Sequence, residues 1–183
     1  MARLLSSSGY LALEINFREL DNNEWVQYDI AFLWNEISLI ADAVLKRHIA
    51  YWNDRVNGAF RINESEKDTL IPVIEQVLAT NKPDYWEPLE PDVTLAFYPG
   101  KFFPFIDETE IASVRSDNNT ELNKCNSNTA IYEDLITVIT MIDEYNFQGS
   151  KAFSGDGIAL ILTCKKQDLT DFLKQLKQEY SVL

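Results

Sequence analysis

The stretch LALEINFRELDNNEWVQYDIAFLWNEISLIADAVL, residues 11–45, contains the pattern that decides the fold. Apolar and polar side chains alternate over Leu11–Arg18, which is typical of a β-strand with one buried face. The same alternation returns over Val26–Phe32. These two runs predict a β-hairpin with a tight type I′ turn at Asn22-Asn23, because asparagine tolerates the left-handed backbone that such a turn needs.

The position of this turn determines which residues of the two strands lie opposite one another. The predicted pairs are Leu13 with Phe32, Ile15 with Ile30, Phe17 with Tyr28, Glu14 with Ala31, Asn16 with Asp29 and Arg18 with Gln27. One turn therefore separates apolar from polar side chains on both strands, whereas a slip of one residue mixes the two faces.

Three segments have the apolar spacing of amphipathic helices. In the first, Asn35 is the expected N-cap, Glu36 lies in the first turn and the basic residues 46–48 lie in the last turn, where they suit the helix dipole. The third is expected to begin with Asp168 as its N-cap and to continue to Tyr180.

The second helix follows a capping-box pattern at 65–68 and contains a proline. Pro72 lacks the N–H that a helix interior needs, so the helix either kinks there or begins near Thr69 with Pro72 in its first turn.

Further strands are expected at Val93–Tyr98, at 102–105 with Pro104 restricting it to an edge or bulge, and at Ile158–Thr163. Residues 131–142 are compatible with helix or strand, and their β-branched content favours a strand from Leu135 onward.

The connections are expected to be irregular. Residues 49–61 are interpreted as a turn-containing connection, Asn81–Pro91 as an extended surface segment without regular structure, and 116–128 as a polar loop insertion. Runs of adjacent strands favour the α+β class: a mainly antiparallel sheet that opens with a β-hairpin and is packed by about three helices. We expect one domain over residues 1–183.

The charge balance limits the classes of partner. The chain has 29 acidic against 16 basic residues, for a formal net charge of -13, which is the wrong sign for gripping nucleic-acid phosphates. An acidic surface suits a basic protein partner, although acidity that only maintains solubility is the simpler interpretation. No apolar run is long enough to span a membrane and no secretory signal is evident, so we expect a cytoplasmic protein.

The residues that usually carry catalysis or hold cofactors are sparse. His48 is the only histidine and is expected at a helix end, while Cys125 and Cys164 are far apart in the sequence, which excludes a His/Cys zinc site. The alternate acidic and amide residues at 117–121 lack the glycine of a calcium-binding loop. No cofactor, metal or catalytic residue is therefore predicted, and pairs of carboxylates remain the open alternative for catalysis.

One segment has the composition of a binding surface, because it places a tryptophan and a tyrosine among carboxylates on a proline-stiffened backbone. Aromatic anchors on a preordered backbone are what binding hot spots use. The alternative is that the two aromatic residues only cover the edge of the core. The candidate partner-binding residues are Asp84, Tyr85, Trp86, Glu87, Glu90 and Asp92.

Several short motifs resemble the small immunity proteins of the WapI type over most of the chain outside residues 100–130. They are Leu13-x-Ile15, Trp25–Ile30, Glu36 opening a helix, the strand Glu90–Phe97, the Gly157-led strand through Leu160, and the final helix with Asp168-Leu169, Leu173, Leu176 and Glu179. The polar loop 116–128 and residues 99–105 depart from that pattern. The resemblance implies a protein that neutralises a partner toxin by binding it, without catalytic residues of its own.

The leading hypothesis is a non-enzymatic cytoplasmic binding protein, of the immunity or antitoxin kind, that occludes a basic toxin domain through an acidic face. The alternatives are a small carboxylate-based hydrolase or ligand-binding domain, which requires a deep cleft with convergent acidic groups, and a structural subunit of a larger assembly.

Overall fold

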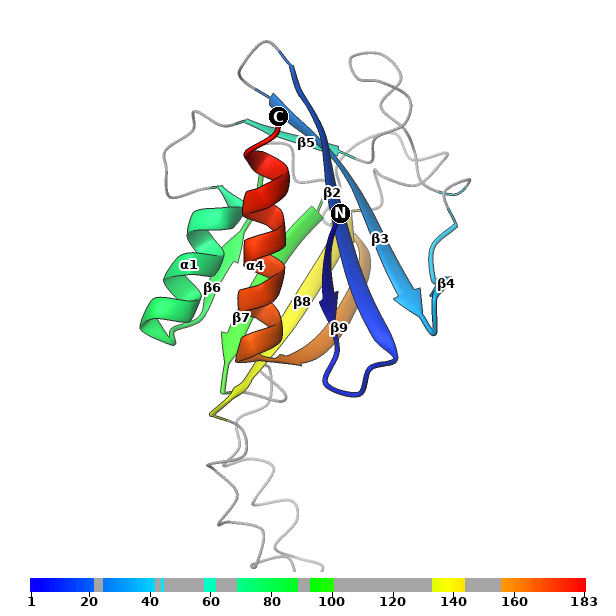
Figure 1. Ribbon diagram of the computed structural model, residues 1–183. Helices are drawn as coiled ribbons and strands as arrows, with labels where there is room; N and C mark the ends of the chain where they lie inside the picture. The colour runs from blue at the N-terminus through cyan, green and yellow to red at the C-terminus, as the bar shows by residue number, and fades with distance from the viewer. Residues whose placement is uncertain are drawn as a thin grey trace, which may run out of the picture.

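The computed structural model describes residues 1–21, 25–41, 44, 58–61, 69–88, 93–100, 133–143 and 156–183. Within these residues the chain forms two antiparallel sheets and two helices (Figure 1). The predicted α+β class is therefore confirmed. The prediction of about three helices is not matched in the described residues, for the reason given below.

The first sheet contains five strands. They are β1 (Ala2–Leu5), β2 (Leu11–Asp21), β3 (Trp25–Trp34), β4 (Ile37–Ser38) and β5 (Gly58–Arg61). The strands β1, β2, β3 and β4 are neighbours in that order. The β4 strand pairs with the last residues of β3, and β5 pairs with its first residues. The β1 strand was not among the sequence predictions, because four residues are too few to show a period.

The predicted register of the β2–β3 hairpin is correct for five of its six pairs, from Leu13–Phe32 to Phe17–Tyr28. The pairing of Arg18 with Gln27 is wrong, since Gln27 lies opposite Glu19. A β-bulge inserts Arg18 as an extra residue, and its guanidinium instead contacts the Asp29 carboxylate. The predicted turn at Asn22-Asn23 lies outside the described residues.

The helix predicted after the hairpin is wrong over its first turns. Asn35 and Glu36 have φ values of 48° and 65°, and the chain reverses there so that Ile37 pairs with Trp34 in β4. Positive φ at both central residues is the requirement of a type I′ turn, which ends helical propagation at once. Most of the remaining predicted helix, including residues 46–48, lies outside the described residues.

The second sheet contains four strands. They are β6 (Asp84–Trp86), β7 (Val93–Pro99), β8 (Leu135–Asp143) and β9 (Gly157–Lys165), which are neighbours in that order. The predicted strands in β7, β8 and β9 are confirmed. The expectation of no regular structure over Asn81–Pro91 is wrong at β6, because Trp86 is buried and pairs with Leu95. The strand expected at 102–105 and the loop at 116–128 lie outside the described residues.

Two helices pack against the sheets. The α1 helix (Leu70–Thr80) begins directly after Thr69 and has Pro72 in its first turn, which confirms the second of the two predicted alternatives. The α4 helix (Lys166–Tyr180) begins three residues earlier than predicted, because its N-cap is Lys165. Asp168 is not its N-cap but lies in its first turn, where its carboxylate accepts the backbone N–H of Lys165 at 3.1 Å.

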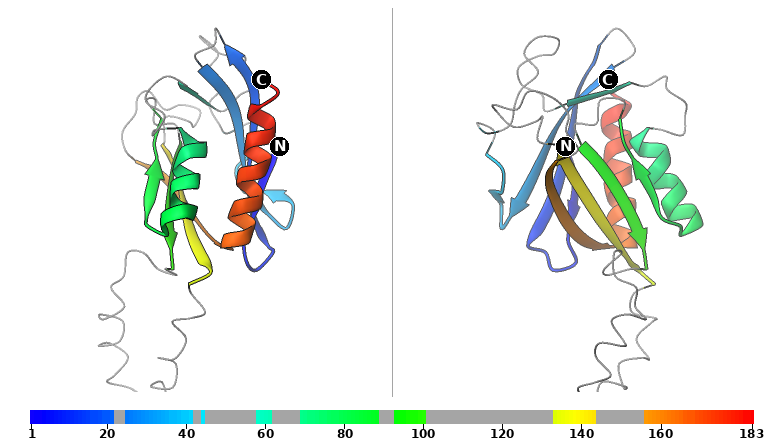
Figure 2. Two further views of the ribbon diagram at one scale, coloured as in Figure 1. Left: turned by 60° about the vertical axis from the view of Figure 1, so that its left-hand side comes forward. Right: turned by 180° about the vertical axis from the view of Figure 1, so that it is seen from behind.

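One hydrophobic core draws on both sheets and both helices. The helices lie on the same side of the second sheet, and α4 also packs against β1 and β2 (Figures 1 and 2). The ring of Tyr28 from β3 meets that of Trp86 from β6 edge to face, with centroids 6.0 Å apart. Contacts of this kind join the two sheets. The face of the second sheet that points away from the helices is seen from the front in the right panel of Figure 2.

The packing at the start of β9 gives a stability prediction. A Cβ added to Gly157 would lie 1.9 Å from the backbone oxygen of Ile142, whereas a Cβ on Gly9 would meet nothing within 4 Å and would only strain a φ of 76°. We expect Gly157→Ala to lower the free energy of unfolding by about 2–3 kcal/mol, and Gly9→Ala by about 1 kcal/mol. Urea unfolding measures both, and equal losses would contradict the close approach at β9.

Candidate functional site

The structure separates the residues of the predicted partner-binding segment. Trp86 is only 2% exposed and belongs to the core, so the alternative that it covers the core is correct for this residue. Tyr85 is 60% exposed, Glu87 is exposed and Asp84 is half-buried. The candidate residues Glu90 and Asp92 lie outside the described residues.

Strand geometry explains why the two neighbouring aromatic residues separate. Successive side chains of a strand point to opposite faces, so Trp86 points toward the helices and Tyr85 points to the other side of the sheet. Along one row of that outer face the sheet pairs Tyr85 with Ala96, Ala96 with Ile139 and Ile139 with Ile161. The two middle residues of the row are buried and the two end residues are exposed. Exposed apolar groups therefore mark both edges of this sheet.

A second exposed aromatic group, which the sequence analysis did not single out, lies at the other sheet. The rings of Tyr10 and Trp34 stack with centroids 5.7 Å apart and an interplanar angle of 26°. Both rings are exposed, as is the neighbouring Ile37. The two rings meet where the β2–β3 pairing ends, since Leu11 lies opposite Trp34 and the Asn35 backbone N–H donates to the Tyr10 backbone oxygen at 2.9 Å.

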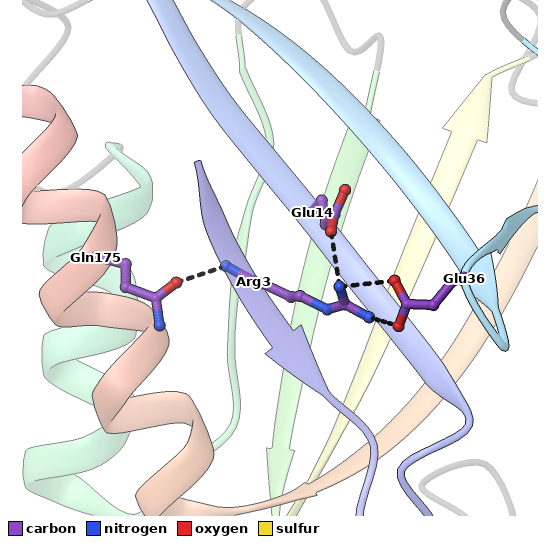
Figure 3. Close-up of polar contacts among 4 residues, drawn as sticks. All are labelled: Arg3, Glu14, Glu36 and Gln175. Atoms are coloured by element: carbon purple, nitrogen blue, oxygen red, sulfur yellow. Dashed lines mark hydrogen bonds and ion pairs between the residues drawn. The ribbon is translucent and has the colours of Figure 1, made fainter.

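An ion cluster holds that turn in place (Figure 3). The Arg3 guanidinium binds both carboxylate oxygens of Glu36, one of them at 2.9 Å, and lies 3.3 Å from a carboxylate oxygen of Glu14. The backbone N–H of Arg3 donates to the Gln175 side chain of α4 at 2.9 Å. The cluster therefore links β1, the turn and α4, and the two terminal nitrogens of the Arg3 guanidinium contact two carboxylates.

The hydrogen bond from Arg3 lowers the pKa of the Glu36 carboxyl from its usual 4.5. The described residues contain no group of three or more potential metal-ligating side chains. In the same residues, no helix has both the length and the apolar character needed to cross a membrane.

The Cys164 thiol is buried at the inner face of β9, and it lies 3.6 Å from the Ile136 backbone oxygen, to which it donates. Burial, with a smaller contribution from the Asp168 carboxylate, raises the pKa of this thiol from 9.0 to about 12. A thiol that stays protonated and covered is not a nucleophile near neutral pH. His48, the residue that a cysteine nucleophile would need, lies outside the described residues.

Comparison with protein-family models, with curated proteins and with solved structures found no match for this chain. The resemblance to WapI-type immunity proteins therefore stays a prediction from the sequence motifs.

The raised pKa of Cys164 predicts both its reactivity and a pH effect. In a Cys125→Ser background, a thiol reagent at pH 8 should modify the native protein at least 100-fold more slowly than the urea-unfolded protein. The neutral buried thiol stabilises the fold fully below pH 9, and this contribution is lost as the pH rises toward about 12. Unfolding free energies should thus fall more steeply above pH 9 than in the Cys164→Ala variant, and parallel curves would contradict this.

The ion cluster gives a second titration prediction. Because the Arg3 hydrogen bond is the main cause of the lowered Glu36 pKa, Arg3→Gln should raise that pKa toward 4.5. Carboxyl NMR chemical shifts measured against pH report this directly. The matched control is Arg18→Gln, which removes the ion pair with Asp29 elsewhere on the sheet and should leave the Glu36 titration unchanged. A shift in the control, or none in Arg3→Gln, would refute the assignment.

Proposed function

We propose that this chain is a non-enzymatic cytoplasmic protein of the immunity or antitoxin kind, which neutralises a basic toxin domain by binding it. The observation that carries the proposal is the exposed Tyr85 ring on β6, an edge strand among the described residues, whose sequence includes the acidic neighbours Asp84 and Glu87. The partner-binding surface proposed here consists of these three residues together with Glu90 and Asp92 of the following segment, without Trp86.

The charge of the chain supports a cationic partner. With a formal net charge of -13, the protein attracts a basic domain over distances beyond direct contact and speeds its encounter. This attraction is screened over about 8–10 Å at physiological salt. Contact residues are therefore needed to hold the complex, and a tyrosine that is already ordered in a strand serves this purpose at a small entropic cost.

The anchoring of Tyr85 supports its role as such a contact. Its neighbour Trp86 is locked in the core against Tyr28, and the Asp84 carboxylate accepts the Tyr85 backbone N–H at 2.9 Å. The backbone that presents the ring is thus fixed on both sides before any partner arrives. Exposing an aromatic ring on a rigid backbone brings no benefit to folding, but it does favour association.

The test uses the genes that lie next to the gene of this chain in the host genome. The protein that each of them encodes is produced and assayed. We expect one such product to arrest growth when expressed alone, to bind the chain, and to be neutralised by co-expression. Tyr85→Ala should weaken that binding by about 10- to 30-fold, measured by isothermal titration calorimetry.

The matched control is Tyr10→Ala, which removes a ring that is 55% exposed on the other sheet and should leave the affinity within about twofold. Equal losses of binding affinity in the two variants would show that Tyr85 is not a specific contact. Adjacent gene products that neither harm the host nor bind the chain would overturn the proposed function.

A further inference from the structure

Among the residues that the structure describes, no strand pairs with the outer edge of β9 over its first half. Its only neighbour among the described strands is β8, and the backbone oxygen of Thr163 is bonded on the other side by the Ser7 N–H at 2.7 Å. Since backbone groups alternate in direction along a strand, those of Gly157, Ala159 and Ile161 point the same way as those of Thr163. Ser7 therefore covers the edge at Thr163 and leaves Gly157–Ile161 open beyond it.

The edge of the first sheet that is formed by β1 and the end of β2 is protected. The backbone N–H of Arg3 donates to the Gln175 side chain, and that of Phe17 donates to the Glu179 carboxylate at 2.9 Å. Both acceptors belong to α4, which lies along this edge (Figure 1). The other described edge strands are short, with two residues in β4, four in β5 and three in β6. Short strands and covered amides are the usual protection of sheet edges.

Within the described part of the chain, the nine-residue β9 strand has none of these protections over residues 157–161. From Gly157 to Cys164 the sequence GIALILTC contains no charged residue and no proline. Ile161 is 47% exposed on the outer face, where Met141 of the adjacent β8 is also exposed, and Ile158 is 43% exposed on the opposite face. A long, uncharged, apolar edge is a template for pairing with another strand.

We propose that the open edge of β9, residues 157–161, binds an extended cationic segment of the protein partner by strand addition. This inference rests on the proposed function and names how the partner is held. The backbone groups of Ala159 and Ile161 supply the main-chain hydrogen bonds. An apolar side chain of the added strand packs beside Ile161. The basic residues of the added strand are attracted by the net negative charge of this protein.

A second copy of this chain is a poorer occupant of the same edge. Two copies each carry a formal net charge of -13, so their approach is repulsive at low and moderate salt. Because Ser7 already bonds Thr163, a symmetric pairing is confined to the few residues before it. Such a short strand pair does not supply the roughly 1,000 Å² of buried surface that a specific interface needs. A cationic segment is attracted by this charge and not repelled, and its short pairing at β9 is only one part of the surface that holds the proposed partner.

The test uses the full chain and a displayed library of random twelve-residue peptides as the probe. We expect the enriched peptides to alternate apolar and polar residues with period two and to contain lysine or arginine, and their affinity to fall as salt is raised. In the free protein, the amides of Ala159 and Ile161 should exchange with solvent faster than those of Leu160 and Leu162, which pair with β8. A bound peptide should slow exchange at Ala159 and Ile161 by at least tenfold.

Two variants separate backbone pairing from side-chain contact. Ala159→Pro removes the outward N–H and should weaken peptide binding at least tenfold, whereas Ala159→Ser keeps this donor and should bind within about threefold of the original chain. If the proline variant does not fold, the exchange measurement decides alone. Peptides without the period-two pattern, unchanged exchange at Ala159 and Ile161, or no enriched peptide at all would overturn strand addition.

The remaining outcomes distinguish this inference from the proposed function. A dimeric mass in solution, with the Ala159 and Ile161 amides already protected, would assign the edge to a second copy and overturn the cationic partner. A toxin that binds through Tyr85 but is insensitive to Ala159→Pro would overturn strand addition and leave the proposed function standing. If peptides add to β9 but no adjacent gene product is toxic, the proposed function is overturned and strand addition stands.

Discussion

The burial of the apolar face of α4 between the two sheets is the interaction on which the rest of the structure depends. Leu169, Phe172 and Leu176 are almost completely buried, and each contributes about 1.5–3 kcal/mol by leaving water. The helix contacts β1 and β2 on one side and β8 and β9 on the other. Its polar residues Gln175 and Glu179 meanwhile satisfy backbone amides of the first sheet. One helix thus completes the core and closes an edge.

Patterns that are local in the sequence predicted most of the sheet. Alternation placed β2, β3 and β7, a short apolar run placed β9, and the β2–β3 register was correct up to the bulge at Arg18. The β3–β4 turn was missed because Ile37 and Ile40 suit a helix as well as a strand. The deciding facts are the positive φ of Glu36 and its ion pair with Arg3, which lies on β1 and is 33 residues away in the sequence.

The candidate site was predicted in part, and the division has a physical reason. The composition of residues 84–87 correctly drew attention to an exposed tyrosine, but it could not tell which aromatic ring faces the core. Burial of Trp86 depends on Tyr28, which lies on the other sheet. The open edge of β9 is likewise invisible in the sequence. A run of apolar residues predicts a strand, whereas its place at the edge is decided by tertiary pairing.

Net charge and an open strand edge affect association in different ways. The net charge opposes pairing between identical chains, to which the open edge alone would lead. Main-chain hydrogen bonds at an edge accept almost any strand, including one from an identical chain, so the edge alone invites self-association. A charge of -13 on every copy opposes that pairing and favours a cationic chain. Charge alone, however, discriminates little among basic proteins. In the proposed complex, the rigidly held Tyr85 ring adds a contact that depends on shape, and the proposal assigns the selection of one partner to the three features together.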